Sequence, residues 1–127
     1  MIYTYNRLLT GVSFAEADER TRRALGEGGF GVLTEIDVAA TIKKLDVEMT
    51  PYLILGACNP KMAYQAIGIE PRVGAMLPCN VILRAVDGGV EVSAIDPVAS
   101  MQAIDSPALH AVAGQVRDLL AAAVAAI

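Results

Sequence analysis

Residues 51–81 read PYLILGACNPKMAYQAIGIEPRVGAMLPCNV and decide how the rest of the chain is arranged. The apolar run Tyr52–Ala57 has the length of a strand, and its lack of alternation predicts a central strand covered on both faces. Asn59-Pro60 then predicts a helix start, because the asparagine caps the first turn and proline takes a position that needs no N–H. That helix is expected to end at Gly68, after which the chain returns through Pro78 into another strand.

Two strand–helix pairs are predicted ahead of this stretch. Ile2–Leu9 alternates weakly, as a strand does, and Ser13 with Glu16 forms a capping box at the start of a helix that Gly28-Gly29 end. A second strand follows, and then a short helix from Val38 to Leu45. One face of the second strand is expected to consist of Phe30, Val32, Thr34 and Ile36.

The C-terminal part is predicted as a hairpin followed by helices. Strands Val81–Val86 and Val90–Ile95 flank Asp87-Gly88-Gly89, which is a typical hairpin turn. Asp96-Pro97 begins a helical turn, and Ser106-Pro107 begins a long final helix. The order is therefore β-α-β-α-β-α-β-β-α, which predicts one α+β domain over residues 1–127, a mixed sheet with helices packed on it.

Composition and charge exclude several partners. The net charge is −4, and the ten Lys and Arg residues form no cluster longer than two, so nucleic acid is not an expected partner. No apolar segment approaches the ~20 residues that cross a bilayer. The N-terminus lacks the pattern of a signal peptide, which predicts a cytoplasmic protein whose cysteines stay reduced. Hydrophobic residues make up 54% and charged residues 19%, which favours self-association, most simply as a homodimer.

Both cysteines of the chain lie in residues 51–81, each followed by asparagine: Cys58-Asn59 and Cys79-Asn80. Cys58 ends a strand immediately before a helix N-terminus, a place where the pKa of a thiol can be lowered. If the two strands are neighbours, the sulfurs converge and permit a reversible disulfide, a two-thiolate metal site or a persulfide carrier. Met76 adds a thioether candidate for Cu(I). The alternative for each cysteine is ordinary core packing, since free cysteine is a strongly buried residue type.

Other polar residues give weaker signals. Glu35 and Asp37 share one face of a strand and could bind a cation or act as acid and base. The alternative is that Asp37 caps the next helix while Glu35 is solvated or pairs with a lysine. The single histidine, His110, has no sequence partner and is expected at the surface or an interface. No nucleotide-binding, hydrolase or zinc-protease motif is present, so no cofactor is required by any motif.

The blocks GFGVLTEID (29–37), GACNP (56–60), LPCNV (77–81) and IDP (95–97) resemble an uncharacterised bacterial and archaeal family, domain of unknown function 302. The resemblance covers nearly the whole chain. It implies a compact α+β domain with a curved sheet backed by helices, and a homodimer. It implies no reaction, so it identifies no catalytic residue. It places both cysteines and Glu35 and Asp37 inside the signature blocks.

Three functions follow from these features. The first is a homodimeric binding module that holds a ligand, soft metal or sulfur species near Cys58 and Cys79. The second is a thiol-dependent redox or sulfur-transfer enzyme with Cys58 as nucleophile and Cys79 as resolving thiol. The third is a structural or interaction protein with both cysteines in its core.

Overall fold

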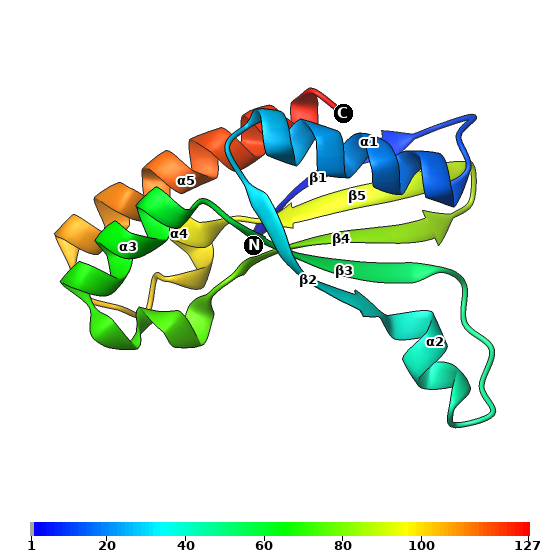
Figure 1. Cartoon of the computed structure of the whole chain (residues 1–127), viewed down its shortest axis with the longest axis horizontal. Helices are drawn as coiled ribbons and strands as arrows, with labels where there is room; N and C mark the ends of the chain where they lie inside the picture. Colours follow the sequence, from blue (N-terminus) through cyan, green and yellow to red (C-terminus); the bar gives the residue numbers. More distant parts are fainter. Residues whose placement is uncertain (1) are drawn as a thin grey trace.

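Five strands pair in the order β1-β5-β4-β3-β2 in a computed structural model that describes residues 2–127 (Figure 1). Every neighbouring pair is antiparallel. The strands are β1 (Thr4–Leu9), β2 (Gly31–Asp37), β3 (Tyr52–Cys58), β4 (Cys79–Val86) and β5 (Gly89–Ile95). The α+β class predicted from the sequence is confirmed.

The helices occupy one face and both ends of the sheet. The long helices α1 and α5 pack against the sheet, α2 lies at one end of it, and α3, η1 and α4 gather at the other (Figure 1). Their bounds are α1 (Phe14–Glu27), α2 (Val38–Lys43), α3 (Pro60–Ile69), the 3₁₀ helix η1 (Pro71–Met76), α4 (Pro97–Ser100) and α5 (Pro107–Ala125). The predicted order of elements is confirmed, with η1 in the segment before β4 as an addition.

The expected mixture of parallel and antiparallel strands is wrong, because the sheet is antiparallel throughout. A parallel pair needs a connection that crosses the face of the sheet. Here α2 joins β2 to its neighbour β3, and α3 with η1 joins β3 to its neighbour β4, each at one end of the sheet. Among the described elements only the connection through α1 runs from one edge strand to the other, and β1 and β2 are not neighbours.

The main core lies between the sheet and helices α1 and α5. It consists of alternate strand residues, such as Leu55, Leu83 and Val92, together with helix residues such as Leu25 and Leu120, all at most 1% exposed. No helix within residues 2–127 covers the other face of the sheet (Figure 1). The prediction that β3 is the central strand, covered on both faces, is therefore wrong. It is second from an edge, and its apolar run reads as continuous because isoleucine and tyrosine also line the uncovered face.

A β-bulge changes the predicted face of β2. The register with β3 shifts between Val32 and Thr34, so that Leu33 has no partner across the strand and is 66% exposed. Val32 consequently packs against the core, whereas Thr34 and Ile36 lie on the uncovered face. The expected shared face is wrong, because one extra residue in a strand reverses the alternation beyond it.

The predicted helix starts are confirmed by their capping hydrogen bonds. The Ser13 hydroxyl accepts from the Glu16 N–H at 3.1 Å, and the Ser106 hydroxyl caps α5 in the same manner at 3.2 Å. The Asn59 side chain accepts from the Met62 N–H at 3.2 Å. These caps fix where α1, α5 and α3 begin, and the last of them fixes the chain beside Cys58.

Candidate functional site

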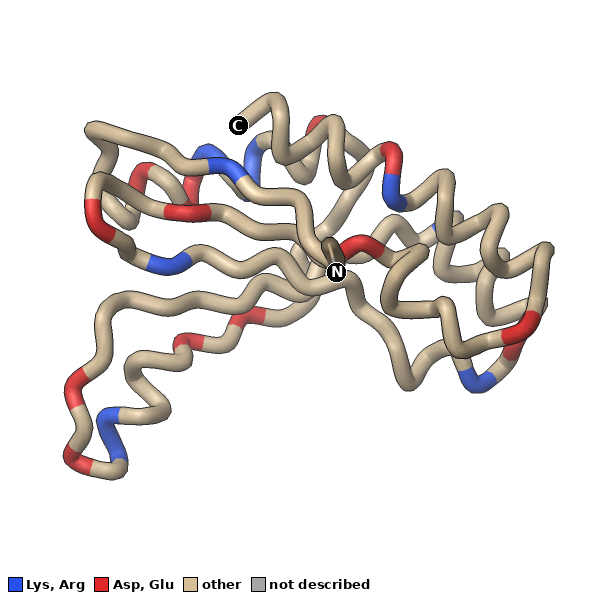
Figure 2. The backbone as a smooth tube through the Cα atoms, turned by 180° about the vertical axis from the view of Figure 1, so that it is seen from behind, with Lys and Arg blue, Asp and Glu red and all other residues tan. Residues whose placement is uncertain are grey.

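A small cavity lies where β3 ends, β4 begins and the helices α3, α4 and α5 meet. Its volume is about 30 Å³, and its lining residues include the sulfur-containing residues Cys58, Met62, Cys79 and Met101, together with apolar residues such as Leu109. We call it the thiol cavity. None of its lining residues is charged, and few charged residues lie along α3, η1 and α4 at this end of the molecule (Figure 2).

Strand pairing places the two cysteines on neighbouring strands, one residue out of register. Cys79 is the first residue of β4 and lies opposite Ala57, the residue that immediately precedes Cys58 in β3. The chain reaches that position through η1 and a cis peptide bond between Leu77 and Pro78. The sequence left open whether this return brings Cys79 close to Cys58, and both cysteines indeed line the same cavity.

The two thiols differ in exposure. Cys79 is buried at 7% exposure and belongs to the main core, whereas Cys58 is half-buried. Burial raises the pKa of the Cys79 thiol to about 11, and the charge of Cys58 contributes to the same rise. Both cysteines are free thiols. Cys79 therefore remains protonated at neutral pH.

Two methionines of the thiol cavity were not predicted from the sequence. Met62 lies in the first turn of α3, where a side chain points back toward the helix start and so toward Cys58. The position of Met62 in the first turn of the predicted helix could therefore have indicated that it lies near Cys58. Met101 comes from the residue after α4, and nothing in the local sequence relates it to the cysteines. Met76, the predicted thioether, ends η1 at 39% exposure and does not line the cavity.

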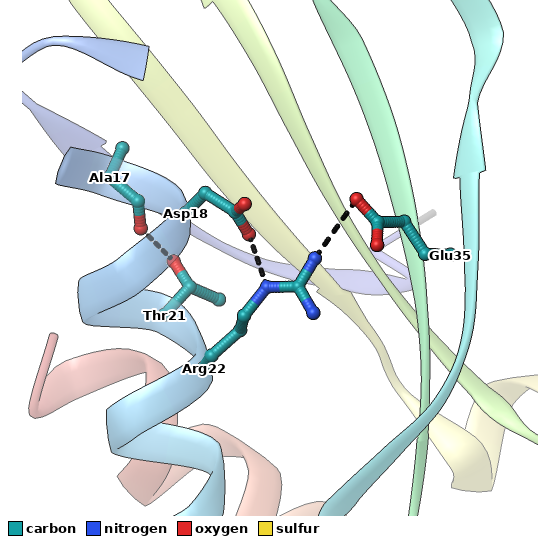
Figure 3. Close-up of polar contacts among 5 residues, drawn as sticks. All are labelled: Ala17, Asp18, Thr21, Arg22 and Glu35. Atoms are coloured by element: carbon teal, nitrogen blue, oxygen red, sulfur yellow. Dashed lines mark hydrogen bonds and ion pairs between the residues drawn. The ribbon is translucent and has the colours of Figure 1, made fainter. Parts of the chain in front are cut away.

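The two carboxylates proposed from the sequence lie elsewhere. The carboxylate of Glu35 forms an ion pair with the guanidinium of Arg22 of α1, at 3.1 Å. The same guanidinium forms a second ion pair with Asp18, at 2.7 Å (Figure 3). The hydrogen bond to Asp18 and the interaction with Glu35 raise the pKa of Arg22. Asp37 accepts from the Ala40 N–H at 2.9 Å and caps α2. Both groups are therefore held in structural roles, and neither lines the thiol cavity.

The two asparagines that follow the cysteines lie in different parts of the structure. Asn59 lines the thiol cavity and caps α3, whereas Asn80 is exposed and lies opposite Gly56 on the uncovered face of the sheet. His110 is half-buried near the start of α5, and its Nε2 has no hydrogen-bond partner among the described residues. It does not line the thiol cavity.

Two further depressions are open to solvent. One of about 270 Å³ lies beside α2 and is lined in part by Asp37, Lys43 and Tyr52. The other, of about 480 Å³, lies on the uncovered face of the sheet between Tyr3 and the ion pair of Arg84 with Glu91. Neither contains a cysteine, so the thiol cavity is the better candidate for thiol chemistry.

The described residues limit the metal chemistry available. Within residues 2–127 no group of three or more His, Cys, Asp and Glu side chains is placed to hold a metal ion. A four-ligand structural zinc site needs such a group. Over the same residues, no helix combines the length and hydropathy required to span a membrane.

These features define a small α+β protein with an antiparallel sheet, one uncovered sheet face and a cavity lined by two thiols. The chain belongs to the family described as Domain of unknown function DUF302, which it matches over residues 5–127. It is also similar to a crystal structure of an uncharacterized conserved DUF302 protein from Bacillus stearothermophilus. The identity is 26%, the TM-score is 0.91, and 98% of each chain is covered. No curated protein matches the sequence.

Proposed function

We propose that this protein is a small binding module that holds a single soft atom, either a metal ion or a sulfur atom, between Cys58 and Cys79. The observation that carries this proposal is that both free thiols line one uncharged cavity. Thiols are soft ligands, and an uncharged wall offers little to a hard cation such as Mg²⁺ or Ca²⁺.

The size of the cavity supports an atom rather than an organic ligand. Its volume is about 30 Å³, whereas an engineered cavity that binds benzene measures ~150 Å³ and pockets for drug-sized ligands measure ~300–1,000 Å³. The space is enough for about one water-sized object. A metal ion or one sulfur atom fits that limit.

Two observations favour binding over thiol-based catalysis. Cys79 lies opposite Ala57 and not opposite Cys58, so the strand register does not pair the two cysteines directly. No acidic, basic or histidine side chain lines the cavity to move a proton. A purely structural role accounts for buried Cys79 but not for half-buried Cys58 in the same cavity.

A titration with Hg(II) tests whether the two thiols act together. One equivalent should remove both thiols from a colorimetric count, because an ion in the cavity contacts both sulfurs. Mass spectrometry under denaturing conditions should then find one mercury on one chain. The Cys58→Ser and Cys79→Ser variants should each lose mercury readily to a competing thiol. A requirement for two equivalents, or mercury joining two chains, would show that the cysteines bind separately and would end the proposal.

We also propose that the protein is a homodimer formed through the uncovered face of the sheet. Apolar residues lie along that face: Leu8 and Ile36 are about half exposed, and Ile54 and Ile82 lie between them. The charged residues among its strand positions, Arg84 and Glu91, form an ion pair at 2.9 Å and so neutralise each other. A surface that mixes apolar and polar side chains and carries no net charge suits a second copy of itself.

Replacing Ile36 by glutamate should weaken this dimer, because it places two like charges in a self-complementary interface. Sedimentation should find about twice the chain mass of 13.3 kDa for the unmodified protein and a shift toward 13.3 kDa for Ile36→Glu. Leu45→Glu is the matched control, since Leu45 is 70% exposed just beyond α2 and should leave the mass unchanged. A 13.3 kDa particle at every concentration of the unmodified protein would contradict the dimer.

Two free thiols in one cavity also support a reducing compartment as the working environment. We therefore propose the cytoplasm as the location of the protein.

A further inference from the structure

Four of the seven cysteine and methionine residues of the chain line one small cavity. From this we propose, building on the proposed function, that the ligand is Cu(I), bound by the sulfurs of Cys58 and Cys79 with the thioethers of Met62 and Met101 beside them. The two methionines reach the cavity from different elements, α3 and the residue after α4, so their convergence is a property of the fold and not of a sequence motif.

The ligand set distinguishes copper from other soft species. Thiolate and thioether sulfur together select Cu(I), whereas a carried sulfur atom needs one thiol and gains nothing from a thioether. Zinc is disfavoured because the described residues supply no third His, Cys, Asp or Glu ligand. Cu(I) accepts few ligands and prefers sulfur, so it fits a cavity lined by two cysteines and two methionines.

A bridging ion tolerates a wider separation of two sulfurs than a disulfide does. A disulfide bond is about 2.05 Å long, whereas two metal–sulfur bonds of about 2.3 Å allow the sulfurs to stand up to ~4.6 Å apart. Cys58 follows Ala57, the partner of Cys79, and ends β3 where the chain turns into α3, and both cysteines line the thiol cavity there.

The bound site would carry a net negative charge, and no acidic or basic side chain lines the cavity to balance it. Binding replaces the two thiol protons, which pass to solvent, by one Cu(I), and leaves a net charge of −1 without any change of oxidation state. The first turn of α3 lies beside this charge, because Cys58 and the cap residue Asn59 precede the helix directly. The N-terminal end of a ten-residue helix stabilises a neighbouring negative charge.

The experiment is an anaerobic competition for Cu(I) against a colorimetric chelator, combined with X-ray absorption at the copper edge. One Cu(I) per chain is expected, with sulfur as its only neighbour. Met62→Leu and Met101→Leu should each weaken binding by about tenfold or more, since even loss of an outer-shell partner costs ~10–100-fold. Met76→Leu is the matched control, because Met76 lies outside the cavity, and it should bind as the unmodified protein does.

Leucine and methionine have similar volumes, so these variants should keep the fold, which circular dichroism checks. The copper assignment is overturned if Met62→Leu and Met101→Leu both bind Cu(I) like the unmodified protein, or if the Cys58→Ser/Cys79→Ser double variant still binds it. If one Hg(II) bridges both thiols but Cu(I) does not bind, the copper assignment is wrong and the binding module stands. If Hg(II) binds the two thiols separately, both proposals fail.

Discussion

Cys79 should react with iodoacetamide at neutral pH at least about a hundredfold more slowly than an unhindered thiol. The thiolate is the reactive form, and burial raises the pKa of this thiol from an ordinary 9.0 to about 11. The difference, 11 − 9.0, is about two pH units, and each unit lowers the thiolate fraction about tenfold. Peptide mapping of the alkylated protein, with N-acetylcysteine as the reference thiol, measures the rate at Cys79 alone.

The same pKa predicts a loss of stability in alkali. Between pH 9 and pH 11 the unfolded chain releases the Cys79 proton while the folded chain keeps it, so the free energy of unfolding falls as pH rises. The stability that the protonated Cys79 contributes is fully present below pH 9. About 2–3 kcal/mol of it is lost as the pH rises to 11 and beyond. Urea denaturation at several pH values should show this fall, and Cys79→Ala should lack that part of it. Two results would contradict burial of the Cys79 thiol. One is rapid alkylation of Cys79 at pH 7, and the other is an equal fall in the free energy of unfolding between pH 9 and pH 11 for the unmodified protein and for Cys79→Ala.

Gly56→Ala should lower the free energy of unfolding by about 1–3 kcal/mol, the usual effect of overfilling a packed site. A methyl group at this position would overlap Thr34 Oγ1 and lie 2.7 Å from Cγ of the Pro78 ring. The threonine side chain can rotate away, but the proline ring is fixed to the backbone that leads into Cys79. Denaturation by urea at one fixed protein concentration measures the effect, because the proposed dimer would couple stability to concentration.

Gly114→Ala is the matched control for this prediction. Gly114 lies inside α5, where a methyl group meets only the end of Arg117, at 3.9 Å. Alanine favours a helix over glycine, so this variant should be more stable by about 0.5–1 kcal/mol. Adding Thr34→Ala to Gly56→Ala should restore only part of the loss, since the contact with Pro78 remains. Equal effects of Gly56→Ala and Gly114→Ala would show that β3 and Pro78 do not approach each other closely.

Much of the fold could be predicted because local chemistry fixes where its elements begin. Ser13, Asn59 and Ser106 cap their helices by hydrogen bonds that depend on residues three positions away. The Asp87-Gly88 turn, with Gly88 at a φ of +88°, likewise depends on neighbouring residues alone. Such signals lie within a few residues of the structure that they specify.

The arrangement of the strands could not be predicted in the same way. Helical segments joining β2, β3 and β4 suggested crossovers, but α2 and α3 return the chain at the ends of the sheet. The apolar run of β3 indicated burial on both faces, because the sequence of one strand does not show which of its faces a helix covers. The bulge after Val32 gave no signal at all.

The candidate site was half predictable. Two cysteines at strand ends suggested convergence, and the pairing of Cys79 with Ala57 brings both to one cavity. Glu35 and Asp37 share a face as expected, but contacts with Arg22 and the α2 backbone occupy them. The packing of α4 and α5 against α3 adds Met101. That contact joins residues about forty positions apart, a separation that only the folded chain removes.

The most direct measurement of the central claim is a crystal structure of the protein soaked with one equivalent of Hg(II), located by anomalous scattering. We expect a single mercury peak between the end of β3 and the start of β4, in contact with the sulfurs of both Cys58 and Cys79. Two separate peaks, each beside one sulfur, or a peak at Cys58 alone would contradict a shared two-thiol site.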